Sequence, residues 1–219
     1  MRATQSLLGI RVAALAADGF ETVELTKPMK RLRKEGAEVR VVSLRPGHIR
    51  GMNFLLRGKR VRVDQTLATT SASDFDALLL PGGFANPDFL RQSPRVLQLV
   101  REFDRAGKPI AVICHGAWVL ISAGLVHGRR LTSWPGIADD VRNAGGVWLE
   151  SSVVRDRNWV SSRGPLDLPV FCDAIVALFA ELAPRRGIIP STPLRAAGLL
   201  LTASALTTAA LYARWRLAS

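Results

Sequence analysis

Short apolar runs alternate along this chain with segments that have the apolar spacing of helices. The runs that read as buried strands are residues 10–16, 38–44, 75–80 and 110–113. The helical patterns are residues 21–35, 94–106, 137–144 and 167–182. A basic, hairpin-like stretch follows the second run as far as residue 63, and a pair of strands is expected over 153–154 and 158–162. Such alternation predicts an α/β fold, with a doubly wound parallel sheet between two layers of helices.

One of these apolar runs ends at a cysteine. Residues 110–113 lead directly to Cys114, and residues 116–123, which are small or apolar, then have a helical pattern. A strand, a sharp turn and a helix with a nucleophile at the turn form a nucleophile elbow. The helix N-terminus would favour a thiolate, and its free N–H groups can stabilise an oxyanion. A buried structural cysteine is the alternative, because free cysteine packs as a small hydrophobic residue.

The carboxyl ends of parallel strands meet at one edge of a sheet, where the active residues of such folds gather. The segments that follow three of the expected strands are residues 18–21, 81–83 and 114–115. Their convergence favours a functional Cys114 and nominates Glu21, a carboxylate at the start of the first helix. Gly83 would allow close backbone approach and supply an N–H group to an oxyanion. An ordinary helix-end charge and a plain tight turn are the alternatives for these two residues.

The composition fits one domain with a possible appendage, since the chain has 219 residues of which 48% are hydrophobic. The two cysteines, Cys114 and Cys172, do not form a disulfide framework and indicate a reducing, cytoplasmic compartment. We expect Cys172, in the middle of a helical pattern, to lie in the core. The first ten residues make a poor signal peptide. No Cys and His spacing is typical of zinc, and no cofactor is expected.

The net charge of +12 is unevenly distributed. Residues 27–62 contain twelve lysines and arginines but only two acidic residues, Glu35 and Glu38. Such a patch could attract nucleic acid or anionic lipid, although a solvated helix face and hairpin explain it more simply. Because only Phe54 is available there to stack on a base, nucleic acid is not an expected partner.

Five motifs follow one another at intervals along the chain. They are DGFETVEL (18–25), FDALLLPGG (75–83), GKPIAVICHG (107–116), TSWPG (132–136) and NWVSSRGP (158–165). In this order they resemble the intracellular protease PfpI family, a branch of the class I glutamine-amidotransferase-like superfamily. The resemblance extends from about residue 10 to residue 182. It implies a flavodoxin-like sandwich, a cysteine nucleophile with a glutamate beside it, and dimers that often assemble further.

The resemblance also implies roles for individual residues. Cys114 would be the nucleophile, Glu21 the carboxylate near its sulfur, and His115 the neighbouring imidazole. In the family this imidazole can pair with an acid from an adjacent subunit, and Asp88 falls near the position of that acid. Asp88 is shorter than the glutamate of some relatives. The backbone N–H groups of Gly83 and His115 would be the oxyanion donors.

An enzyme that attacks a carbonyl carbon with Cys114 is therefore the first functional hypothesis. The resemblance implies either hydrolysis of short peptides or cofactor-free handling of small aldehydes such as methylglyoxal, as a glyoxalase or deglycase. A glutaminase triad is not expected, because no histidine follows His127. The alternative is a non-catalytic redox-sensing or chaperone-like stress protein, since a reactive thiol oxidises readily. Because the family completes its site across an interface, we expect a homodimer or a higher homo-oligomer.

The chain continues beyond the domain that the family implies. We predict a catalytic domain over residues 1–183, a basic, proline-containing linker over 184–194 and an apolar helix outside the domain over 195–216. Residues 196–213 contain no charge, and this run is just long enough for a bilayer, which takes about 20 residues. The sequence thus predicts a membrane tether for the cytoplasmic domain. A helix docked on an apolar protein surface is the alternative.

Overall fold

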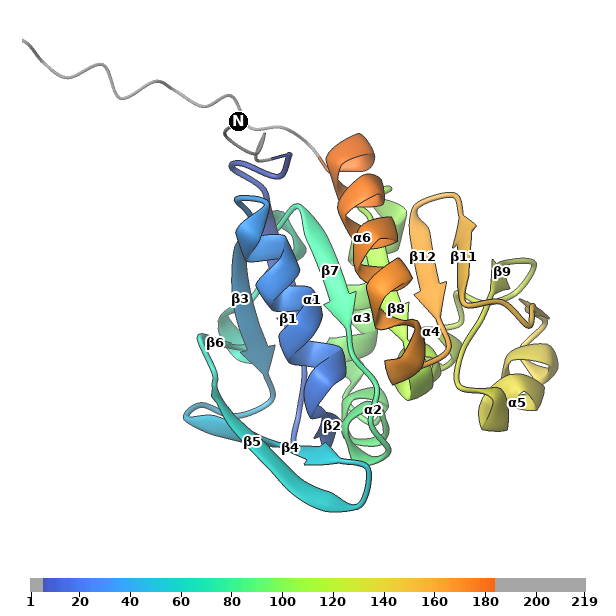
Figure 1. The fold of residues 1–219 in the computed structure, drawn as a ribbon, viewed down its shortest axis with the longest axis horizontal. Coiled ribbons are helices and arrows are strands. Elements are labelled where there is room, and N and C mark those ends of the chain that lie inside the picture. Colours follow the sequence, from blue (N-terminus) through green and yellow to red (C-terminus); the bar gives the residue numbers. More distant parts are fainter. Residues whose placement is uncertain (1–5, 184–219) are drawn as a thin grey trace, which may run out of the picture. The chain divides into compact units, whose positions relative to one another are not determined.

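A sheet of seven strands runs through the computed structural model, which describes residues 6–183 (Figure 1). The strand order is β11-β12-β8-β7-β1-β3-β6. The strands are β1 (Arg11–Leu15), β3 (Glu38–Ser43), β6 (Gln65–Thr66), β7 (Ala77–Leu80), β8 (Ile110–Ile113), β11 (Val153–Asp156) and β12 (Trp159–Ser162). Every pair is parallel except β11 with β12, which is antiparallel. The predicted parallel sheet is confirmed, with an antiparallel strand at one edge.

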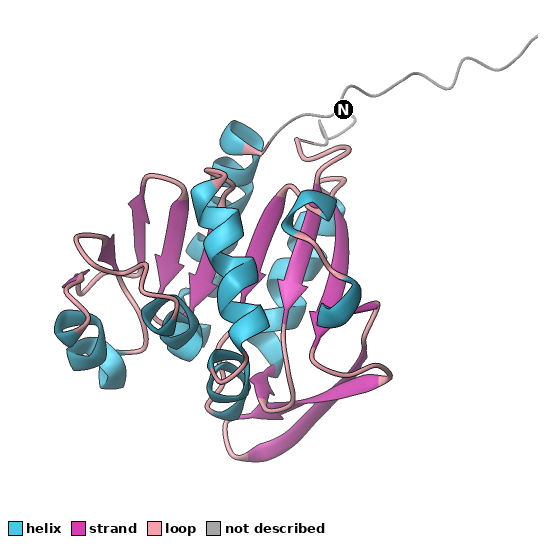
Figure 2. Ribbon diagram, turned by 180° about the vertical axis from the view of Figure 1, so that it is seen from behind, coloured by secondary structure: helices cyan, strands magenta, loops and turns pink. Residues whose placement is uncertain are grey.

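Helices cover both faces of this sheet. Helices α1 (Thr22–Lys34) and α6 (Leu168–Leu182) pack on the face turned to the viewer in Figure 1. Helices α3 (Pro94–Arg105) and α4 (Ala117–Ser122) pack on the opposite face, which Figure 2 shows. Two short helices, α2 (Ala85–Arg91) and α5 (Ala138–Asn143), contact α4.

The strand side chains alternate between two cores. Val12 and Ala14 of β1 pack against α1 and α6, whereas Ala13 and Leu15 pack on the side of α3 and α4. Strands buried on both faces need apolar residues at successive positions, which explains the continuous apolar runs of the sequence. The doubly wound sandwich is therefore the observed architecture.

A small second sheet lies beyond the carboxyl edge of the main one. It has the order β2-β4-β5 and consists of β2 (Phe20–Glu21), β4 (His48–Asn53) and β5 (Leu56–Arg62). Strands β4 and β5 form an antiparallel hairpin, as the basic stretch of the sequence predicts. The turn of this hairpin exposes the apolar side chains of Phe54 and Leu55. A further parallel pair joins β9 (Arg130–Leu131) and β10 (Val147–Trp148).

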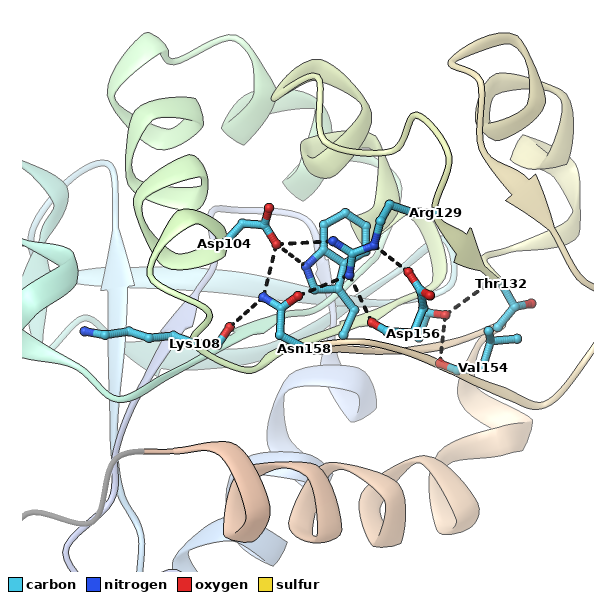
Figure 3. Close-up of polar contacts among 9 residues, drawn as sticks. Asp104, Lys108, Arg129, Thr132, Val154, Asp156 and Asn158 are labelled. Carbon is cyan, nitrogen blue, oxygen red and sulfur yellow. Dashed lines mark hydrogen bonds and ion pairs between the residues drawn. The ribbon is translucent and has the colours of Figure 1, made fainter.

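A buried polar network holds β12 in place beside β8 (Figure 3). Arg129 is only 5% exposed, pairs with Asp104 and Asp156, and places its guanidinium 3.7 Å from the centre of the Trp159 ring. The Trp159 indole N–H donates to Asp104 at 2.8 Å, and the Asn158 amide donates to the same carboxylate at 3.1 Å. These contacts join α3 to β12. Because β12 pairs with β8, they also help to position the strand that leads to Cys114.

Several short elements of the structure were not predicted from the sequence, and two predicted segments lie outside the described residues. Helix α2 and the short strands β2, β6, β9 and β10 are too brief to produce a periodic apolar pattern, and the sequence did not reveal them. Within residues 6–183, no helix combines the length and apolar character that a membrane span requires. The predicted linker over 184–194 and the apolar helix over 195–216, with its membrane contact through 196–213, lie outside the described residues.

Candidate active site

Cys114 occupies a sharp turn between β8 and α4. Its φ is 60°, a left-handed conformation that costs a residue other than glycine roughly 1–2 kcal/mol. A single 3-10 turn over Cys114–Gly116 then leads into α4. Gly116 is needed here, because a Cβ atom on it would lie 2.8 Å from the carbonyl oxygen of Leu80. The predicted nucleophile elbow is thus confirmed in its geometry, including its strained backbone.

The glycine turn after β7 lies directly against the cysteine. A Cβ atom on Gly82 would come within 2.6 Å of the Cβ atom of Cys114. Gly83 has a φ of 84°, and a Cβ atom there would lie 2.5 Å from the backbone nitrogen of Glu21. The backbone N–H groups of Gly83 and His115 both act on the thiol of Cys114, whose pKa they lower. The two groups predicted as oxyanion donors therefore converge on the sulfur.

Asn86 keeps this turn in position, a role that the sequence did not suggest. Its side chain is fully buried and donates to the carbonyl oxygens of Pro81 at 2.9 Å and Gly82 at 3.0 Å. Its own amide oxygen accepts from the backbone N–H of Ala17 at 2.6 Å. Asn86 thereby joins the carboxyl ends of β1 and β7. An asparagine before a proline reads as an ordinary turn, so no sequence signal marked it.

The carboxyl group beside the sulfur belongs to Glu24. This residue lies in the first turn of α1, is fully buried and contacts the thiol of Cys114. Its Oε2 atom accepts a hydrogen bond from the N–H of Gly82 at 2.9 Å. Burial raises the pKa of Glu24 from 4.5 to about 8. Glu24 is therefore mostly protonated at pH 7, and it then places no negative charge beside the sulfur.

The prediction that Glu21 is the carboxylate near the sulfur was wrong. Glu21 precedes α1 in the short strand β2, and its Oε2 atom accepts from the N–H of Phe54 at 2.9 Å. Its side chain therefore holds the turn of the β4–β5 hairpin, although Glu21 still lines the cavity above Cys114. Its negative charge contributes to the raised pKa of Glu24. The two glutamates are three residues apart, and the start of the helix decides which one reaches the cysteine.

His115 lies close to the thiol. Its Nδ1 atom is 3.2 Å from the Sγ atom of Cys114. Its ring packs against Trp118 and Trp134, with ring centres 5.0 Å and 5.9 Å away, and against Phe84 at 5.8 Å. Burial by these rings lowers the pKa of His115. The imidazole is therefore neutral at pH 7 and can accept the proton of the thiol.

Two acids bear on the role predicted for this imidazole. Asp88, on α2, pairs with Arg91 at 2.8 Å, and its predicted contact with a histidine of an adjacent subunit stays a prediction. Asp140, on α5, accepts from the indole N–H of Trp118 at 2.8 Å, and its charge raises the pKa of His115. The sequence reasoning missed Asp140, because only the fold brings α5 to this side of α4.

The resting thiol is not activated in the way that the sequence suggested. Burial raises the pKa of Cys114, and a negative charge on Glu24 would raise it further. The N–H groups of His115 and Gly83 lower it, but the net direction is upward. The N–H group of His115 at the helix N-terminus thus favours the thiolate, as expected, but burial outweighs this effect in the resting site. A neutral thiol beside a neutral imidazole can still react if the proton moves to His115 as the sulfur attacks.

A cavity of about 180 Å³ lies above Cys114. Besides the cysteine, His115 and the two glutamates, its walls are mainly apolar, formed by Phe54, Leu55, Phe84, Trp134 and Pro165. The second cysteine, Cys172, is buried on α6, as the sequence predicts.

Comparisons with known proteins agree with this geometry. The model of the DJ-1/PfpI family matches residues 10–178. The chain belongs to this family. It is 46% identical over 169 residues to a deglycase of Pyrococcus abyssi, covering 77% of this chain and 99% of the relative. It is 38% identical over 162 residues to a putative cysteine protease, YraA, of Bacillus subtilis, covering 74% of this chain and 93% of that protein.

A solved structure shows the same fold. Drosophila melanogaster DJ-1beta matches with a TM-score of 0.72 and 30% identity, over 80% of this chain and 91% of that one. The fold is therefore the flavodoxin-like sandwich of the DJ-1/PfpI proteins. The relatives, one named a deglycase and one a putative cysteine protease, make this chain an enzyme, a deglycase-like or protease-like cysteine hydrolase.

Proposed function

We propose that Cys114 adds to the carbonyl carbon of a small aldehyde, so that the protein acts as a cofactor-free glyoxalase or deglycase. The observation that carries this proposal is the size of the cavity above the sulfur, about 180 Å³. Pockets for drug-sized ligands usually measure about 300–1,000 Å³. A compact dicarbonyl such as methylglyoxal, or its adduct with an amine, suits this volume better than an extended peptide. Hydrolysis of very short peptides is the second candidate, supported by the protease-like relative.

The first chemical step uses four residues of the site. As the Sγ atom of Cys114 forms a bond to the carbonyl carbon, the thiol proton moves to Nδ1 of His115 and the C=O electron pair moves to oxygen. The N–H groups of Gly83 and His115 stabilise the negative oxygen, a contribution of about 10²–10³-fold per donor in comparable sites. The proton then passes from the imidazole to that oxygen, which gives a hemithioacetal. Glu24, in its neutral form, places no negative charge beside the sulfur during the attack.

Turnover distinguishes this enzyme from a redox sensor. We expect steady-state consumption of methylglyoxal, or cleavage of a short peptide amide, by the wild type but not by Cys114→Ala. Cys172→Ala is the matched control, because Cys172 is the other buried cysteine and lies on α6. Methylglyoxal turnover with an inert peptide would favour the glyoxalase or deglycase. Oxidation of Cys114 without turnover of either compound would instead favour the redox-sensing or chaperone-like alternative.

We also propose that a second copy of the chain covers the mouth of the cavity. Phe54, Leu55 and Phe84 line the cavity but are 76%, 92% and 73% exposed. Apolar side chains gathered in this way are typical of an interaction surface. Light scattering should therefore show at least a homodimer at micromolar concentration. A fully active monomer would contradict this proposal.

A further inference from the structure

A second concave site, a groove of about 690 Å³, lies between helix α1 and strand β5. Basic side chains from both elements line it. They are Lys27, Lys30 and Arg33 on α1, and Lys59, Arg60 and Arg62 on β5. One acidic residue, Asp64, is among the lining residues, and its carboxylate accepts the backbone N–H of Val41 at 2.8 Å. The groove is separate from the cavity above Cys114, with which it shares no lining residue.

The cations of the groove have no acidic partners in the part of the chain that the structure describes. None of the six forms an ion pair there. On the same helix, by contrast, Arg31 pairs with both Glu35 and Asp173. Like charges gathered in a concave surface create a positive potential that raises the local concentration of anions. The groove is therefore poised to hold a ligand with several negative charges.

The shape of the groove selects among such ligands. Lys27 and Arg33 are six residues apart on a helix, a separation of about 9 Å along its axis. Lys59 and Arg62 span about 10 Å along their strand. A short linear anion can contact both walls over this length, whereas a flat membrane surface would reach only the rims. Among the described residues, no aromatic side chain lines the groove, so these residues offer no platform for stacked bases.

We propose that this groove binds a linear oligophosphate, either a free inorganic chain or the phosphate chain of a nucleotide. Lysine and arginine bind phosphate oxygens through charge-assisted hydrogen bonds, and the two walls supply such donors from both sides. The floor between the walls includes the aliphatic side chains of Met29, Val41 and Val61. Binding at this site requires neither Cys114 nor a turnover reaction, so it does not depend on the function proposed above.

Calorimetric titration of the full-length protein with inorganic tripolyphosphate tests this proposal. We expect saturable binding of one ligand per chain that weakens as the salt concentration rises from about 50 to about 200 mM. The double variant Lys30→Gln/Arg60→Gln removes one charge from each wall and should weaken binding by about tenfold or more. The matched control Arg105→Gln/Arg130→Gln removes two exposed charges outside the groove and should leave the affinity unchanged.

Three further ligands complete the experiment. A nucleoside triphosphate that binds as tightly as tripolyphosphate would show that the phosphates alone are recognised, and tighter binding would identify the nucleotide as the source. The proposal fails if tripolyphosphate does not bind, or if the groove variant and the control variant bind it equally. It also fails if only a single-stranded oligonucleotide or phosphatidylserine vesicles bind, because the surface would then recognise a macromolecule or a membrane.

Discussion

Replacing Glu24 with glutamine should change how the stability of the protein depends on pH. Burial raises the pKa of Glu24 to about 8 in the folded protein, whereas its ordinary value is 4.5. The folded state therefore holds a proton that the unfolded chain releases as the pH rises above 4.5. The free energy of unfolding must fall as the pH rises from about 5 to about 8, because the unfolded state alone gains the ionised carboxylate. Above about pH 8 the ionisation of Glu24 lowers the free energy of unfolding no further.

The decrease in the free energy of unfolding follows from the pKa shift of Glu24. Each pKa unit corresponds to about 1.4 kcal/mol, so a rise from 4.5 to about 8 corresponds to about 4–5 kcal/mol. Glutamine has the shape of the protonated acid and cannot ionise. Its amide oxygen can accept from the N–H of Gly82, and its NH₂ group can donate toward Cys114. Glu24→Gln should therefore lack this loss and match the wild type in stability most closely near pH 5.

Urea denaturation at pH 5, 6.5 and 8 provides the measurement. The stability of Glu24→Gln relative to the wild type should increase by about 4 kcal/mol between the lowest and the highest pH. Glu21→Gln is the control, since Glu21 lines the same cavity but bonds to the hairpin. That variant should keep a strong pH dependence. Equal pH dependence in Glu24→Gln and the wild type would refute the assignment of a raised pKa to Glu24.

The same variant tests the link between Glu24 and the thiol. Ionised Glu24 opposes the thiolate of Cys114, which glutamine cannot do. The ratio of the alkylation rate of Glu24→Gln to that of the wild type should therefore increase as the pH rises through about 8. A ratio that stays constant from pH 6 to pH 9 would show that the two groups do not interact.

Three further substitutions, and one control, test the rest of the structure. Asp140→Asn removes a charge that raises the pKa of His115, so NMR titration should show a lower imidazole pKa, and an unchanged value would contradict the contact. Arg129→Met breaks a buried ion-pair network and should cost about 3–5 kcal/mol in thermal or urea denaturation, against under 1 kcal/mol if the network is unimportant. Gly83→Ala should abolish turnover, because its Cβ atom would lie 2.5 Å from a backbone nitrogen. Gly107→Ala, with a φ of 64° and open space around it, should cost only about 1–2 kcal/mol and leave turnover intact.

The sequence predicted those features that local patterns determine. The run that became β8 is apolar at every position because the strand is buried on both faces, and the cysteine that ends it lies at the predicted elbow. Gly83 could be predicted as well, because a turn after a strand end needs a glycine for close approach. Both residues follow parallel strands, and parallel strands place their carboxyl ends together whatever the rest of the sequence is.

Features that depend on contacts between distant segments could not be predicted. Glu21 and Glu24 are three residues apart, and only the exact start of α1 decides which of them faces Cys114. Asp140 reaches Trp118 from another helix, and Asn86 acts on backbone groups of two strands. The pKa of Cys114 was misjudged for a related reason. Helix ends are visible in a sequence, but the burial that outweighs them arises from tertiary packing.

The protonation of the resting site bears on the choice between an enzyme and a redox sensor. Oxidation of a cysteine depends on its thiolate fraction and its exposure. Cys114 is only 6% exposed, and burial raises its pKa, so both properties slow its reaction with an oxidant that lacks a binding site. A bound aldehyde overcomes both the burial and the raised pKa of the thiol. Its carbonyl carbon lies beside the Sγ atom of Cys114, and Nδ1 of His115, 3.2 Å from that sulfur, accepts the proton as the bond forms. The site therefore favours a nucleophile that reacts when its substrate is bound over a thiol that responds to any oxidant.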